Sequence, residues 1–214
     1  MSRKLKSYKG FGPGLIFTAA GAHAGMIDKE GMAPWEICGL CHSLDGISKM
    51  SKFPILAGQK KSYLRRQLID FKQGLRSNDG GQMAAIVDEF EISDIDQIVN
   101  YFAGLPSPVS QQDLRLGAKQ EEKFQKGKLL FENGRLGVAA CNSCHNPVHP
   151  TAPYLQAEHA AYIRKQLRDF RRGDRANRRS AIMTVIAQKL SEDEVDQLAA
   201  YLQRSARAEV SAAH

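Results

Sequence analysis

Two copies of a Cys-x-x-Cys-His motif carry the most recognisable chemistry of this 214-residue chain. Their members are Cys38, Cys41 and His42 in the first copy, and Cys141, Cys144 and His145 in the second. In such a motif each thiol forms a thioether with a vinyl group of haem, and the histidine becomes an axial ligand of the iron. Because the chain has no other cysteine, the motifs predict two covalently bound haem c groups and a redox function.

Zinc binding and thiol redox chemistry are the other common uses of a C-x-x-C pair. Structural zinc sites usually bring two such pairs within about 15–20 residues of each other, whereas 99 residues separate the two pairs here. A thiol redox motif does not require histidine at the next position, yet this chain has it twice. Haem attachment is therefore the preferred interpretation.

Each iron needs a second axial ligand, and methionine sulfur raises the potential in soluble electron carriers. Met183 is the only methionine after the second motif, 38 residues beyond its histidine, and Met83 lies 41 residues beyond the first motif histidine. We predict these two as iron ligands, although a methionine can also simply pack in a core. Met50 competes in the first copy, and His149 and His159 are alternatives if Met183 is not a ligand.

Two prolines offer hydrogen-bond partners for the haem-ligating histidines. Pro54 follows the first motif histidine by 12 residues, and Pro153 follows the second by eight. A carbonyl at or near each proline could accept the ring N–H and fix the orientation and basicity of the imidazole. An ordinary rigid loop is the alternative, and the sequence leaves both open.

Both motifs belong to an internal repeat, which is a strong guide to domain organisation. Residues 63–78 align with residues 162–177 at a constant offset of 99, and nine of the 16 positions are identical. Flanking residues also match, and each copy contains one motif. The chain therefore contains a duplicated domain.

The repeat predicts where the domains begin and end. Domain 1 is expected at residues 25–104 and domain 2 at residues 117–205. Residues 105–116 form a linker, which starts with two prolines and two serines within six residues and should be semi-rigid. Residues 206–214 form a tail.

Helical periodicity runs through both copies, and no segment alternates like a strand. Helices are predicted at residues 63–71, 121–133 and 162–170, with stops at Gly74 and Gly173 and capping signals at Ser93 and Ser191. The fold class is therefore all-α, with two tandem domains, each a few helices and loops around one haem.

Charge and hydropathy limit the classes of function. The formal charge is +7, but residues 1–24 contribute +4 of it, and no nucleic-acid motif is visible, so nucleic-acid binding is not expected. No apolar run reaches the roughly 18 residues of a transmembrane helix. Residues 1–24 combine a basic start, a short apolar stretch and an Ala-x-Ala site, which indicates a signal peptide or, alternatively, an N-terminal extension.

The combined motifs resemble the di-haem cytochrome c4 family of class I c-type cytochromes. The resemblance rests on the paired motifs, on residues 53–59 (FPILAGQ), on the repeated helix and on Met83, and it covers roughly residues 28–205. It implies two cytochrome c-like domains in pseudo-twofold contact, two His/Met haems and electron transfer in the periplasm. It also implies redox partners such as quinol-oxidising complexes, terminal oxidases or a dehydrogenase.

The chain departs from the family pattern in the second copy. The Leu-Ala-Gly-Gln sequence that ends at Gln59 becomes Leu-Gln-Ala-Glu ending at Glu158. The resemblance implies that Gln59 contacts a haem propionate, where Glu158 would be a like charge, so the two haem environments are expected to differ. The stretch before the first motif, with Trp35, has no counterpart that the resemblance explains.

Three functions are compatible with two haems. We predict an electron shuttle, in which both irons are six-coordinate. A di-haem oxidoreductase needs an open or unusual iron site, and a methionine in each copy argues against it. An electron-transfer subunit bound to a catalytic enzyme is the main alternative, in which six arginines between residues 168 and 179 either dock a partner or form a solvated helical face.

Overall fold

The computed structural model describes residues 30–109, 117–177 and 180–207, and this part of the chain is helical. Its helices are α1 (Pro34–His42), α2 (Lys61–Lys72), α3 (Gln82–Asp88), α4 (Ile92–Gly104), α5 (Ala118–Asn133), the 3₁₀ helix η1 (Cys141–Ser143), α6 (Ala160–Arg172), α7 (Ala181–Lys189) and α8 (Glu192–Arg204). Within the described ranges there is no β-strand, only an isolated bridge between Arg135 and Val138. The all-α prediction is confirmed.

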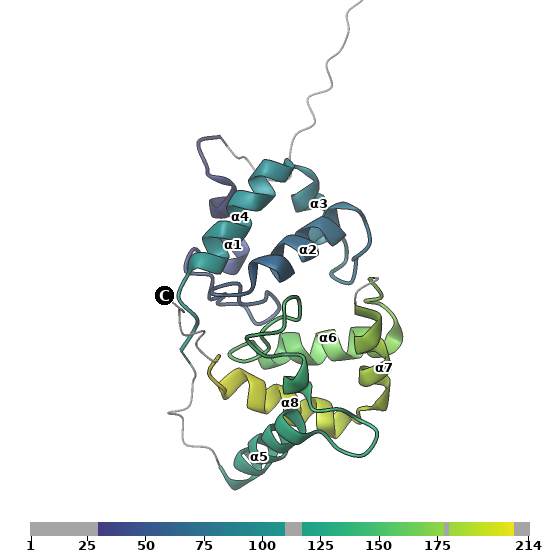
Figure 1. Cartoon of the computed structure of the whole chain (residues 1–214). Helices are drawn as coiled ribbons and strands as arrows, with labels where there is room; N and C mark the ends of the chain where they lie inside the picture. The colour runs from purple at the N-terminus through teal and green to yellow at the C-terminus, as the bar shows by residue number, and fades with distance from the viewer. Residues whose placement is uncertain (1–29, 110–116, 178–179, 208–214) are drawn as a thin grey trace, which may run out of the picture.

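The helices pack as two groups, one above the other in Figure 1. In the first group α4 contacts α1 and α2, and α2 contacts α3; in the second group α8 contacts α5 and α6, and α6 contacts α7. Ile95 and Phe102 are fully buried in the first core, and Val195 and Leu202 have a similar place in the second. Two small cores are what a duplicated sequence predicts.

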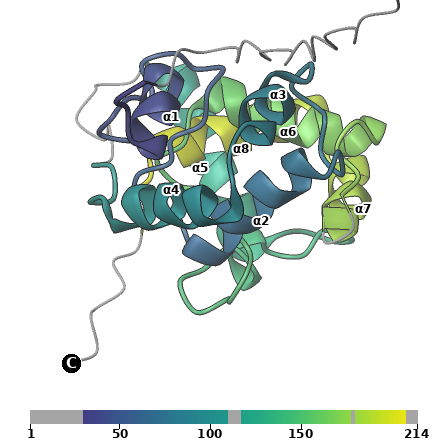
Figure 2. The same ribbon diagram turned by 90° about the horizontal axis from the view of Figure 1, so that it is seen from above.

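The repeated helices α2 and α6 lie on the facing sides of the two groups (Figure 1). Seen from above (Figure 2), α1 and α4 lie at one edge of the molecule and α7 at the opposite edge. Both repeated helices stop as predicted, because Gly173 (φ 81°) and Gly74 (φ 68°) adopt left-handed backbone that favours glycine. Phe71 and Phe170, near the ends of these helices, are also buried.

The capping predictions are right for α8 and wrong for α4. The Ser191 hydroxyl accepts the N–H of Glu194 at 3.1 Å, and the Glu194 carboxylate accepts the Ser191 N–H at 2.8 Å. The N-cap of α4 is Glu91, paired with Asp94, and Ser93 lies inside the first turn. The repeat shifts from an offset of 99 to 100 before this helix, so Glu91 is the counterpart of Ser191.

Several boundary predictions lie outside the described residues, namely residues 1–24, residues 110–116 of the linker and residues 208–214 of the tail. The predicted helix 121–133 begins three residues earlier, at Ala118, and ends at Asn133. The start of the tail is packed rather than free, since Arg207 is buried. Among the described helices, none has the length and apolar character needed to span a membrane.

Candidate haem sites

One continuous cavity of about 710 Å³ lies between the two helix groups. Its wall includes Cys38, Cys41, His42, Pro54, Gln59, Met83, Cys141, Cys144, His145, Pro153 and Met183. These are all the residues that the sequence predicts for the two sites. The volume is within the range of roughly 300–1,000 Å³ that is typical of ligand and cofactor sites.

The two motifs are carried by different backbone structures. The first motif forms the end of α1, which starts with Pro34 and is held by Trp35, whose ring stacks on Tyr101 of α4 at 5.3 Å. The second motif has only the three-residue helix η1, and its Cys144 is exposed. Trp35 therefore has a structural role that the sequence did not reveal.

A proline carbonyl orients each motif histidine. The distance from His42 Nδ1 to Pro54 O is 2.9 Å, and the distance from His145 Nδ1 to Pro153 O is also 2.9 Å. When Nδ1 carries the proton, Nε2 is left with its lone pair for a metal. Burial lowers the pKa of both imidazoles, against the opposing effect of the carbonyls, so the neutral form that ligates iron is favoured.

The first cysteine of each motif is held as a neutral thiol. Burial raises the pKa of Cys38 to about 12 and the pKa of Cys141 to about 11. Cys38 also donates its S–H to the carbonyl of Pro34 at 3.5 Å. Thioether formation adds S–H across a vinyl double bond, so the thiol supplies both atoms that the product needs.

Both predicted methionines lie in the first turn of a short helix, Met83 in α3 and Met183 in α7. Each is half-buried and lines the cavity. The backbone N–H of Met83 donates to the Asp79 carboxylate at 2.6 Å, which fixes the start of α3. Met50 is 52% exposed and lies away from the cavity wall, so the geometry favours Met83 in the first site.

The two alternative histidines are engaged by backbone groups. His149 Nδ1 accepts the N–H groups of Thr151 and Ala152 at 3.3 and 3.0 Å. His159 Nε2 lies 2.9 Å from the carbonyl oxygen of Ser48, in the other helix group. Both side chains therefore stabilise loops, which favours Met183 as the second ligand of the second site.

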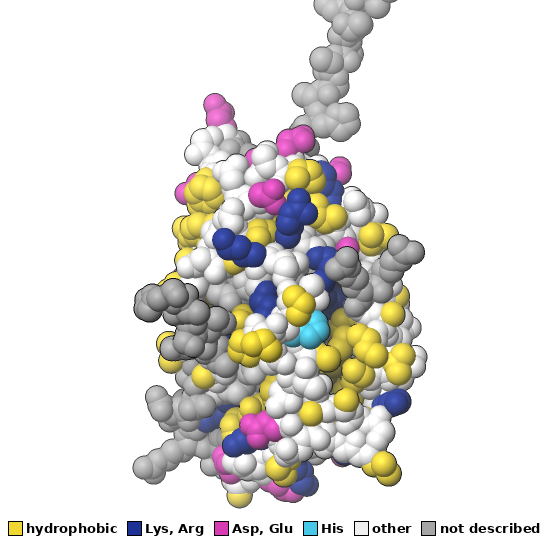
Figure 3. All heavy atoms as spheres, in the orientation of Figure 1, with side chains coloured by type: hydrophobic (Ala, Val, Ile, Leu, Met, Phe, Trp, Pro, Cys, Tyr) yellow, Lys and Arg dark blue, Asp and Glu magenta, His cyan; other side chains and the backbone are white. Residues whose placement is uncertain are grey.

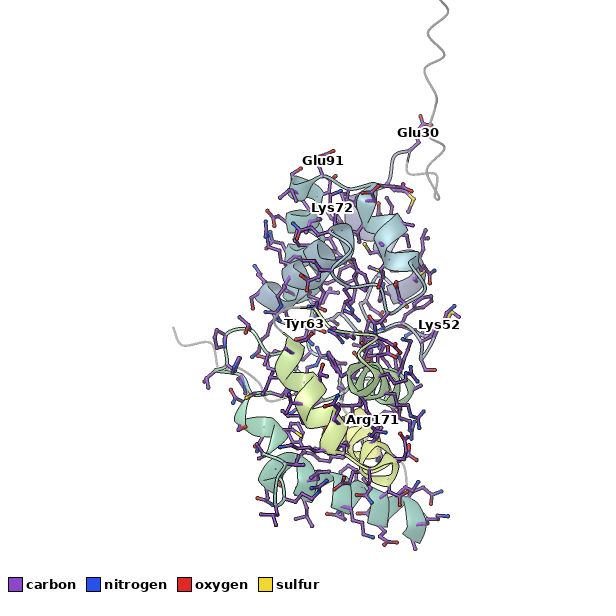
Figure 4. All side chains as sticks on the ribbon, turned by 90° about the vertical axis from the view of Figure 1, so that its right-hand side faces the viewer. Glu30, Lys52, Tyr63, Lys72, Glu91 and Arg171 are labelled. Carbon is purple, nitrogen blue, oxygen red and sulfur yellow. The ribbon has the colours of Figure 1, made fainter. Side chains whose placement is uncertain are left out.

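Two arginines at equivalent positions of the repeat, Arg76 and Arg175, lie buried between the groups with 6% and 5% exposure. Their hydrogen-bond partners at 2.6–3.2 Å include the side-chain oxygens of Gln67, Gln166, Tyr63 and Tyr162. Each guanidinium contacts residues of both groups, and Figure 4 shows Tyr63 at this junction. The repeat identified these residues as duplicated but did not indicate that the two sets meet.

These residues fit two haem c groups. The cavity wall is mainly apolar, and it supplies four thiols, two imidazoles with Nε2 available and two thioethers. The buried guanidiniums donate to neutral oxygens, and Nε of Arg175 has no partner. Buried cations are stable only with compensating anions, and the propionate edge of a haem provides such anions.

Most described members of the arginine cluster are paired with acids. Arg168 and Arg171 both donate to Glu192, and Arg172 donates to Asp174 at 2.8 Å. Arg175 is buried, and residues 178 and 179 lie outside the described part of the chain. This pairing favours the solvated helical face over a free docking surface.

Comparison with known proteins indicates the class of protein to which the chain belongs. No model of a protein family matches the chain. Cytochrome c4 of Pseudomonas aeruginosa is 37% identical over 188 residues, which cover 85% of this chain and 90% of that protein. The crystal structure of reduced recombinant cytochrome c4 from Pseudomonas stutzeri matches with a TM-score of 0.68 at 34% identity, covering 85% of this chain and 99% of that one. The thiosulfate dehydrogenase electron acceptor of Stutzerimonas stutzeri is 32% identical and covers 77% of this chain and 76% of its own length.

Two helix groups, each with a C-x-x-C-H motif on a shared cavity, define a di-haem c-type cytochrome. The chain belongs to the cytochrome c4 family. The predicted family, the two cytochrome c-like domains, the two haem c groups and the electron-carrier role are thereby confirmed.

Proposed function

We propose that the chain carries electrons between redox proteins through two haems with one histidine and one methionine on each iron. His42 and Met83 ligate the first iron, and His145 and Met183 ligate the second. Thioethers join the first haem to Cys38 and Cys41 and the second to Cys141 and Cys144. The observation that carries the proposal is the matched set of ligands, one set from each helix group, on the wall of one cavity.

When bound, each haem supplies a one-electron Fe(III)/Fe(II) couple. His42 with Met83, and His145 with Met183, would hold the two irons and would leave no site on iron for a substrate. Ligand type, hydrogen bonding and burial would set the potential. The proline carbonyls hold the imidazoles at 2.9 Å. Such fixed coordination suits rapid electron exchange rather than catalysis at iron.

Exposed apolar side chains beside the two sites offer contact surfaces for redox partners. Leu40, inside the first motif, is 62% exposed, and Ile182, next to Met183, is also 62% exposed. Val148, three residues after the second motif, is 89% exposed. Figure 3 shows hydrophobic side chains gathered at mid-height on one face of the molecule. Small contact surfaces are typical of transient electron-transfer complexes.

The optical spectrum of the ferric protein tests the ligand assignment. We expect a methionine–iron band near the red end with the intensity of two such bonds per chain. Met83→Ala and Met183→Ala should each remove half of this band, and Met50→Ala, the matched control, should leave it unchanged. A high-spin ferric haem in the resting protein, or peroxide turnover, would contradict the proposal.

A second candidate is an electron-transfer subunit bound to a catalytic redox enzyme. The similarity to a thiosulfate dehydrogenase electron acceptor favours it, and a dehydrogenase of this kind, a quinol-oxidising complex or a terminal oxidase would be the partner. Co-purification of the native chain with a larger enzyme at stoichiometric ratio would support the subunit, and recovery of the chain alone would support the shuttle.

We further propose a periplasmic location, with domains at residues 25–104 and 117–205. Haem attachment to C-x-x-C-H motifs normally takes place outside the bacterial cytoplasm, and the basic start of the chain supports export. N-terminal sequencing of the mature protein tests this, since cleavage after Ala24 is expected.

A further inference from the structure

Gln59 and Glu158 occupy equivalent positions of the repeat and make equivalent contacts across the junction. Oε1 of Gln59 accepts the backbone N–H of Tyr154 at 3.0 Å, and both carboxylate oxygens of Glu158 accept the backbone N–H of Ile55 at 3.1 Å. Each side chain also accepts the N–H of the residue that follows it, at 3.0 Å for Gln59 and 2.7 Å for Glu158. The repeat therefore relates the two contacts to each other.

These contacts involve the same peptide units that orient the haem-ligating histidines. The peptide between Pro54 and Ile55 accepts a hydrogen bond from His42 Nδ1 on its carbonyl and donates its N–H to Glu158. The equivalent peptide of the second site links the other motif histidine to Gln59 in the same way. Hydrogen bonds arranged in a chain polarise one another, so each histidine is connected to a side chain of the opposite helix group.

The two connections end on groups of different charge. Glu158 can ionise, whereas Gln59 is always neutral. Glu158 is buried, with Arg207 from the segment after α8, Tyr63 from α2 and the neighbouring His159 around it. Burial raises the pKa of Glu158 to about 7, although the two N–H donors and Arg207 favour the carboxylate. The carboxylate and the acid are therefore both accessible near neutral pH.

We propose that Glu158 is a positioning residue for the His42 haem, whose potential its carboxylate lowers by acting through the peptide between Pro54 and Ile55. A charged acceptor strengthens the hydrogen bond from a peptide N–H. The carbonyl of that peptide then becomes a better acceptor for His42 Nδ1, and the more basic imidazole stabilises Fe(III). Since Gln59 gives the second histidine no such charge, the His42 haem has the lower potential. The inference rests on the proposed His/Met coordination.

Glu158→Gln is the direct test. It places an amide at the end of the hydrogen-bond connection from His42, as Gln59 already does for His145. The two haems are followed separately in a redox titration by the hyperfine-shifted proton NMR signals of each. Above the pKa of Glu158, the Fe(III)/Fe(II) ratio of the His42 haem at fixed ambient potential should fall by about tenfold, which is 59 mV for a one-electron couple. Its potential should also lose its pH dependence, and the His145 haem should change less.

Equal shifts at both haems, a larger shift at the His145 haem, or no shift would overturn the proposal, since the hydrogen-bond connection from Glu158 runs only to His42. Gln59→Glu provides the reverse test if the first variant does not fold, and it should lower the potential of the His145 haem. A readout independent of potential is the Ile55 amide proton, whose NMR signal should move downfield as Glu158 ionises. An unmodified protein without the methionine–iron band would count against the coordination itself, which separates the two failures.

Discussion

The two candidate haem sites offer the same types of side chain as ligands, but the structures that hold these side chains differ. The first motif ends a regular helix that Trp35 anchors on Tyr101, whereas the second lies on one 3₁₀ turn with Cys144 exposed. The hydrogen-bond connection to the histidine ends on a carboxyl group for the first site and on an amide for the second. The two copies therefore share the predicted haem-binding residues but differ in the backbone that carries them and in the side chain at the end of the hydrogen-bond connection.

The largest expected effect is a loss of stability that depends on how closely helices pack in the second group. A Cβ atom at Gly127 of α5 would lie 2.0 Å from the carbonyl oxygen of Gln197 in α8. Gly127→Ala should therefore destabilise the second group by about 3 kcal/mol or more, since backbone cannot move aside easily. Unfolding in urea, followed by circular dichroism, measures this.

Gly104→Ala in α4 is the matched control, because nothing lies within 4 Å of a Cβ atom there. Alanine should raise the stability of that helix end slightly, by at most about 1 kcal/mol. An equal loss of unfolding free energy in the two variants would contradict this account. It would show that the close contact between α5 and α8 does not determine which residue position 127 tolerates.

The next effect is the pH dependence of stability that Glu158 introduces. Because its pKa is raised from 4.5 to about 7, the folded protein binds one more proton than the unfolded chain between these values, so the free energy of unfolding falls as pH rises through this window. The total loss is on the order of 3 kcal/mol. Glu158→Gln should remove this slope, as urea titrations at several pH values would show.

Gln59→Ala is the control for this prediction, since its side chain makes the equivalent contact without an ionisable group. It should lower stability by a similar amount at every pH. A slope that persists in Glu158→Gln would assign the pH dependence to another group.

The smallest effect compares the capping of α8 and α4. Ser191→Ala removes a hydroxyl that accepts the Glu194 N–H and should cost about 1 kcal/mol. Glu91→Ala should cost less, because serine is among the preferred N-cap residues and glutamate is not. Thermal unfolding of both variants measures the difference, and a larger loss for Glu91→Ala would contradict it.

The sequence predicted the parts of this molecule that depend on local pattern. The motifs were found from residue type and spacing, and the helices from periodicity. Met83 and Met183 line the cavity, and their role as iron ligands stays a prediction. The error at Ser93 arose because Ser93 and Asp96 match the capping pattern, whereas α4 begins two residues earlier with the pair Glu91 and Asp94.

The contacts between the two groups could not be predicted in this way. Arg76 meets Gln166 across 90 positions of sequence, and Glu158 meets Ile55 across 103. Such pairs depend on how the two domains dock, and the same side chains would look unremarkable in a separate domain. Arg207 is a further example, because a residue at the start of a predicted tail is buried between the groups.

Proton NMR of the fully reduced protein tests most directly whether each half carries its own His/Met haem. The ring current of haem shifts the methyl group of an iron-bound methionine far upfield, so each such ligand gives one isolated three-proton signal. We predict two signals, one lost in Met83→Ala and the other in Met183→Ala. A single signal, or two that both persist in either variant, would contradict the assignment.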